Sequence, residues 1–159
     1  MNLDNFRLLR DPGHFLALGG GSGLLPKAPG TAGTVVGMVI FWPLAALDNY
    51  VYTGLVLALF ALGVPLCSRT SLAIGANDHP AIVWDEIVGI LLTMAFVDPN
   101  PFNCILGFLA FRIFDIFKPW PINVLDQRVR GGIGVMLDDV FAALYAGLTL
   151  VFIEYISYI

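Results

Sequence analysis

The sequence has little charge. Aspartate, glutamate, lysine and arginine make up 13% of its 159 residues, and hydrophobic residues make up 58%. Ordinary soluble domains have about 25% and about 45 to 50% of these classes. With a mean hydropathy of +0.82, this composition excludes a typical soluble protein and predicts a single membrane domain over residues 1–159. The formal net charge of −4 gives no support for nucleic-acid binding.

Cysteine is scarce as well. Cys67 and Cys104 are far apart, without a CxxC spacing or a neighbouring histidine, which excludes a zinc site and a disulfide framework. We expect both to be apolar fillers. Residues 1–16 lack the apolar run of a secretory signal peptide. We therefore expect a retained, cytosolic N-terminus, with residues 1–14 forming a short helix on the membrane surface.

Several common catalytic loops are missing. The glycine- and proline-rich stretch 15–34 departs from the Walker A pattern because Ala28 follows Lys27, and Leu24 breaks both the Rossmann and the GxSxG spacing. Neither a cysteine-phosphatase loop nor a DxDx[TV] motif occurs. The polar side chains of the stretch include Ser22, Lys27, Thr31 and Thr34. They suit either an anion-binding loop or a re-entrant membrane loop.

Apolar runs separated by polar or proline-containing breaks predict an all-α fold, a small polytopic membrane protein with short membrane helices. The runs cover 34–47, 50–66, 87–97, 102–117 and 140–159, and residues 67–84 are expected to form a short helix and a turn. The first four runs are short for a perpendicular crossing, because the hydrocarbon core is about 30 Å thick and a helix rises about 1.5 Å per residue.

If the runs alternate in direction, most basic residues fall on one side of the membrane. They are Arg7, Arg10, Lys27, Arg69, Lys118, Arg128 and Arg130. By the positive-inside rule this side is the cytoplasm. Asp48, Asp98 and Glu154 fall on the opposite side.

Three groups of ionisable residues then lie at the cytosolic ends of different helices. They are Asp85 with Glu86, Arg112 with Asp115, and Asp138 with Asp139. Ionisable groups in membrane helices are costly and usually mark functional sites. The dipole of a helix beginning at residue 140 accounts for one carboxylate of the last pair but not for its neighbour. Gly131, Gly132 and Gly134, just before that pair, are expected to let the backbone turn tightly and approach a ligand.

The residue types at these positions favour phosphate chemistry. Carboxylates hold Mg²⁺ together with substrate phosphate, and the expected catalytic and metal-binding residues are Asp85, Glu86, Asp138 and Asp139, with Asp115 as a further ligand. Phosphate oxygens suit Lys27, Thr31, Thr34, Arg112, Lys118 and Arg130. Such a site would polarise a phosphoryl group and orient a water. The hypothesis is metal-assisted hydrolysis of a phosphomonoester at the cytosolic membrane surface.

The remaining histidine and tryptophan residues are weaker candidates. His14 and His79 are isolated, and His79 precedes Pro80, which favours a turn at the membrane interface over a catalytic role. The three tryptophans fall near predicted helix ends, where we expect interfacial anchors: Trp42, Trp84 and Trp120.

Four blocks together resemble the phosphatidylglycerophosphatase A family. They are GSGLLPKAPGTAGT at 21–34, IVWDEIVG at 82–89, FRIFDIFKPWPI at 111–122 and GGIGVMLDDV at 131–140. The resemblance implies a magnesium-dependent lipid phosphatase of the bacterial inner membrane. Its substrate would be phosphatidylglycerophosphate, its products phosphatidylglycerol and phosphate, and no protein partner is implied. The resemblance also supports a functional role for the acidic pairs and for the loop around Lys27.

Two other functions remain open from the residues alone. Charges inside membrane helices also line the ion path of a small transporter or channel, although no internal duplication is visible. A basic cytosolic face also suits a non-catalytic protein that binds anionic lipid.

Overall fold

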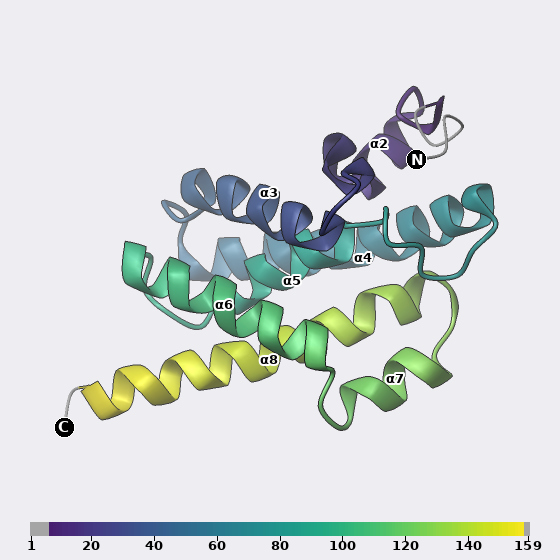
Figure 1. Ribbon diagram of the computed structural model, residues 1–159. Helices are drawn as coiled ribbons and strands as arrows, with labels where there is room; N and C mark the ends of the chain where they lie inside the picture. Colours follow the sequence, from purple (N-terminus) through teal and green to yellow (C-terminus); the bar gives the residue numbers. More distant parts are fainter. Residues whose placement is uncertain (1–6, 158–159) are drawn as a thin grey trace.

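The computed structural model describes residues 7–157, whose regular structure consists of helices without any strand (Figure 1). This confirms the predicted all-α class. The elements are α2 (Pro12–Ala17), the 3-10 helix η1 (Gly19–Leu24), α3 (Pro29–Leu44), α4 (Asn49–Ile74), α5 (Trp84–Met94), α6 (Pro101–Phe117), α7 (Ile122–Arg128) and α8 (Gly131–Ser157). The surface helix expected over residues 1–14 lies partly outside the described residues, and α2 begins only at Pro12.

Polar caps set the starts of several helices. The Asp11 carboxylate accepts hydrogen bonds from the backbone N–H groups of Gly13 and His14 at the start of α2. The side chains of Asp48 and Asn100 cap α4 and α6 in the same way. These caps satisfy N–H groups that have no partner within the helix, so each apolar segment begins at a defined residue.

Helix α5 is the centre of the bundle. Nine of its 11 residues are buried, and it packs against α3, α4, α6 and α8. Figure 1 shows it in the middle, with α3 above and α6 below. A helix that is apolar on all sides needs protein or lipid around its whole surface. Here the surrounding helices provide that cover, so the run predicted at 87–97 is a core helix of the protein.

Two helices are long and apolar enough to cross a membrane. They are α4 with 26 residues and α8 with 27 residues, and each is roughly 40 Å long at about 1.5 Å per residue. Only 22% and 28% of their most apolar windows are buried inside the protein. Most residues in these windows are therefore not buried by the protein, which fits membrane association.

Two expected boundaries are wrong. Residues 67–74 belong to α4, which continues through Pro65 and ends at Gly75 in a left-handed conformation with φ 79°. Helix α8 begins at Gly131 instead of residue 140, because Gly132 and Gly134 pack closely on protein backbone. A side chain at Gly132 would overlap the Val64 carbonyl of α4. These two glycines thus serve close backbone packing, and the expectation that they approach a ligand stays a prediction.

Other expectations concern single side chains. Cys67 and Cys104 are buried free thiols, in line with their expected role as apolar fillers. Trp42 and Trp120 are exposed. Trp84 is buried and its indole Nε1 donates a hydrogen bond to the Leu59 carbonyl at 3.1 Å, so its assignment as an interfacial anchor is wrong.

Candidate metal and phosphate site

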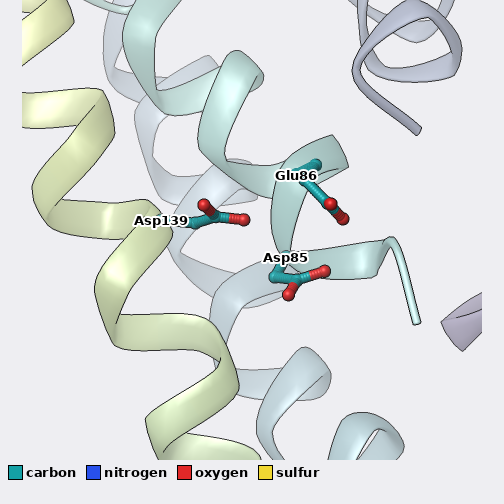
Figure 2. A group of neighbouring side chains, drawn as sticks. All are labelled: Asp85, Glu86 and Asp139. Carbon is teal, nitrogen blue, oxygen red and sulfur yellow. The ribbon is translucent and has the colours of Figure 1, made fainter. Parts of the chain in front are cut away.

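Three carboxylates from two helices meet at one end of the bundle. Asp85 and Glu86 stand in the first turn of α5, and Asp139 stands in the third turn of α8. One oxygen of each lies within 4.8 Å of the others. Figure 2 shows Asp139 pointing from α8 towards the α5 pair. We call these three residues the acid trio.

Close helix packing brings the acid trio together. A Cβ atom at Gly89 would lie 2.6 Å from the Phe111 ring and 3.4 Å from Cβ of Asp139. On α8, Ala142, Ala143 and Ala146 are completely buried. Small residues at these positions let α8 approach α5 and α6 closely, which brings Asp139 next to the first turns of α5. Because α8 begins at Gly131, the helix dipole account of the Asp138–Asp139 pair is also wrong.

The acid trio is buried and incompletely hydrogen-bonded. Asp85 and Asp139 are 7% and 3% exposed. Asp85 Oδ1 and Glu86 Oε2 have no hydrogen-bond partner. Burial, together with repulsion from Glu86 and Asp139, raises the pKa of Asp85 well above its usual range, and burial raises the pKa of Glu86 to about 7. Buried carboxylate oxygens without partners are the groups that a bound cation would satisfy, so the trio fits a hard divalent metal.

Two basic side chains flank the acids. Arg112 Nη1 lies 2.6 Å from Asp115 Oδ2, 4.0 Å from Glu86 Oε1 and 3.4 Å from the Thr34 hydroxyl oxygen. Its Nε is buried and has no partner. An arginine held beside the trio with a donor to spare is well placed to bind a phosphate oxygen.

Lys118 occupies the other flank. Its Nζ donates to Asp126 Oδ1 at 2.6 Å and to Asp138 Oδ2 at 2.7 Å. Burial alone would lower the pKa of Lys118, but these hydrogen bonds raise it above its usual value. Asp138 is therefore paired with a cation, while its Oδ1 is buried without a partner. Asp115 is likewise paired with Arg112, and neither aspartate belongs to the acid trio.

A cavity of about 160 Å³ opens on the trio. Its lining consists of Asp78, Pro80, Ile82, Asp85, Glu86, Asp115, Lys118, Asp138 and Asp139. Sequence reasoning missed Asp78, which lies in the connection between α4 and α5 with φ 50°. The polar segment Asn77 to Pro80, directly ahead of a predicted acidic pair, was the available signal for it.

The other residues predicted to bind phosphate lie outside the lining of this cavity. Thr34 is buried, donates to the Gly30 carbonyl and accepts from Arg112. Arg130 lines a neighbouring cavity of about 350 Å³ that shares Asp78 with the first. Thr31 is partly buried in the first turn of α3, and Lys27 is exposed. Neither lines the cavity around the trio.

The loop predicted at 15–34 is mostly helical. It contains α2, η1 and the start of α3, and Gly20 and Gly21 within η1 adopt positive φ angles of 67° and 99°. The part that reaches the acids is the start of α3, where a side chain on Gly30 would overlap Glu86 Oε1. His79 Nδ1 accepts a hydrogen bond from the Ala81 N–H at 3.1 Å, which fits the expected turn.

Comparison with known proteins identifies the family of the chain. A family described as Phosphatidylglycerophosphatase A matches residues 15–154. Phosphatidylglycerophosphatase A of Haemophilus influenzae is 41% identical over 152 residues, covering 92% of this chain and 91% of the relative. The Escherichia coli protein of the same name is 38% identical over 146 residues, covering 91% and 85%.

A third relative carries a different name. A Bacteroides thetaiotaomicron protein named putative phosphatidylinositol-3-phosphatase is 33% identical over 138 residues, covering 82% of this chain and 86% of the relative. No solved structure matches the chain. The family match and the two relatives that share its name cover nearly the whole chain, and the chain belongs to the phosphatidylglycerophosphatase A family.

Proposed function

We propose that the chain is a magnesium-dependent lipid phosphatase that hydrolyses phosphatidylglycerophosphate to phosphatidylglycerol and inorganic phosphate. Membership of the family and the names of its relatives support the reaction. The position of the reaction in the molecule rests on one observation: the acid trio has oxygens without hydrogen-bond partners and lies beside Arg112. The whole chain would then form one catalytic membrane domain.

The charge balance of the cavity supports the need for a metal. Six carboxyl groups and one lysine line it, and Arg112 adjoins it. A phosphate dianion would be repelled from so acidic a cavity unless cations compensated the carboxylates. Asp85, Glu86 and Asp139 would hold Mg²⁺, which prefers oxygen ligands. Magnesium, when bound there, supplies positive charge that stabilises the phosphoryl and leaving oxygens.

The chain's own residues supply binding and proton transfer. Arg112, which has its Nε free and its Nη1 beside Glu86, binds a phosphate oxygen and orients the phosphomonoester. Asp138 is held by Lys118 through Oδ2, so its unpartnered Oδ1 accepts the proton of the attacking water. The new P–O bond forms with that water oxygen, the P–O bond to glycerol breaks, and the proton that Asp138 accepted from the water passes to the leaving oxygen.

The distribution of charge supports a cytosolic site in a multi-pass arrangement in the bacterial inner membrane. Gly132 of α8 packs on Val64 and Ser68 of α4, so the end of α4 and the start of α8 lie at the end of the bundle that holds the trio. Asp98 and Glu154 line a cavity with residues from the other end of α4. Lys118 and Arg130 line cavities at the trio's end, whereas Asp98 and Glu154 lie at the other. By the positive-inside rule, this distribution supports a cytoplasmic position for the trio.

Phosphate release by the purified full chain in detergent tests this function. We expect hydrolysis of phosphatidylglycerophosphate with Mg²⁺ and none after chelation with EDTA. Glu86→Gln should abolish turnover, whereas Glu154→Gln, the matched change about 20 Å or more along α8 from Asp139, should leave it near the wild-type rate. Release at an equal rate in EDTA, or no release with any divalent ion, would refute the proposal.

A further inference from the structure

We propose that an acyl chain of the lipid substrate binds in an apolar groove between α3 and α6, entered from the Arg112 side of the acid trio. This inference rests on the proposed lipid phosphatase function. It adds a second binding site to the one for phosphate, and it concerns the part of the substrate that does not react.

The groove is lined by apolar side chains. Met38 of α3 and Cys104, Ile105, Phe108 and Leu109 of α6 enclose a cavity of about 240 Å³. Ile105 and Leu109 are 64% and 51% exposed at its rim. The groove lining contains neither a charged side chain nor a hydroxyl. The groove therefore does not suit a phosphate, but it suits the methylene groups of an acyl chain.

The packing of α5 leaves room for this groove. Helices α3 and α6 both pack on α5, and they contact each other at few positions. Gly37 of α3 lies against Ile90 of α5, and Gly107 of α6 lies against Met94. Helices α3 and α6 therefore both sit close on α5, which lies between them in Figure 1, and make few contacts with each other.

The helix faces that line the groove also carry the polar residues beside the acids. Residues three, four and seven positions apart share one face of a helix. On α6 this face carries Arg112, then Leu109 and Phe108, then Ile105. On α3 it carries Thr34, then Met38 one turn further. Arg112 Nη1 lies 3.4 Å from the Thr34 hydroxyl oxygen, so the two faces meet beside the acids at their polar end.

Each facing stripe thus changes from polar beside the acids to apolar away from them. This polarity gradient matches a lipid phosphomonoester, which carries its charge at one end and its hydrocarbon at the other. Between Arg112 and Ile105 the groove extends by about 10 Å along the helix axis. The headgroup linker and the first part of an acyl chain fit a path of this length and polarity.

Filling the groove tests the proposal. We would measure kcat/KM of wild type, Leu109→Trp and the control Leu148→Trp for dipalmitoyl and dibutyryl phosphatidylglycerophosphate in mixed micelles. Leu148 is also exposed, at 60%, but stands on α8. Displacing about two methylenes from an apolar site lowers kcat/KM about tenfold. We expect this loss for Leu109→Trp with the long-chain substrate only, and no loss for Leu148→Trp.

Equal losses on both substrates, or no loss on either, would overturn the groove while leaving the phosphatase function intact. No hydrolysis by wild type would overturn the proposed function instead. A binding readout separates the two further. A phosphatidylglycerophosphate analogue with a diazirine on one acyl chain should label peptides containing Met38 or residues 104–109 in the wild-type chain. Labelling confined to α4 or α8 would contradict the groove whether or not turnover occurs.

Discussion

Gly30 offers a substitution that separates activity from stability. It lies in the first turn of α3, where an added Cβ would overlap Glu86 Oε1 and approach Arg112 Nη1 to 3.2 Å. The obstructed atom is the end of a flexible side chain, so Gly30→Ala can be accommodated by rotation of the Glu86 carboxylate. The carboxylate oxygen must then move by roughly 1 Å, a displacement that typically costs about 100-fold in rate at a catalytic site.

The same substitution should cost little folding free energy. Alanine is favoured over glycine in a helix by about 1 kcal/mol, which offsets the strain of moving one carboxylate at the end of a flexible side chain. We therefore expect Gly30→Ala to lower kcat by about 10- to 100-fold at fixed Mg²⁺, while the thermal unfolding midpoint in detergent stays within a few degrees of wild type.

Two glycines serve as matched controls for this assay. Gly54 of α4 has no atom within 4 Å of an added Cβ, so Gly54→Ala should leave activity unchanged and raise stability slightly. At Gly33 an added Cβ would lie 2.6 Å from Cβ of Val83, so Gly33→Ala should lower the unfolding midpoint clearly. Wild-type turnover by Gly30→Ala would refute the placement of Glu86 in the active site.

Two further predictions concern the charged groups. Lys118→Met removes the amine that pairs with Asp138, and we expect a loss of about 2 kcal/mol in unfolding free energy; this is below the value for a fully buried pair because the lysine side chain is 26% exposed. At the exposed Lys27, Lys27→Met should leave stability unchanged, and equal losses of stability in both variants would contradict the pairing. Since burial raises the pKa of Glu86 to about 7, apparent Mg²⁺ affinity should rise as the pH increases through about 7. Without metal, folding stability should change in the opposite direction and fall as the pH rises. The reason is that the folded state binds more protons than the unfolded state between about pH 4.5 and about pH 7. Chemical denaturation at several pH values with EDTA would then show stability falling as pH rises, and a flat profile would contradict it.

The acidic residues of the site could be predicted because charge is rare in this sequence. Asp85, Glu86 and Asp139 stand beside long apolar runs, where an ionised side chain is costly without a function. The sequence could not show which of the carboxylates lie close enough together to hold one metal ion. Asp138 is next to Asp139 in the chain, yet the helix turns it towards Lys118.

The helix boundaries were harder to predict than the helices themselves. Glycine disfavours helix by about 1 kcal/mol per residue, which argued against helix at Gly132 and Gly134. Close packing of Gly132 on the α4 backbone outweighs that propensity. The burial of α5 was equally hidden, because a continuous apolar run looks the same whether protein or lipid surrounds it.

The claim on which the account depends is that the acid trio holds a divalent cation. Manganese binding to the full chain in detergent, followed by electron paramagnetic resonance as free Mn²⁺ is titrated, measures this directly and without turnover. Wild type and the distant variant Asp98→Asn should both bind Mn²⁺ and release it to excess Mg²⁺, and Asp139→Asn should bind it at least about tenfold more weakly. Equal Mn²⁺ affinity in wild type and Asp139→Asn would contradict the account.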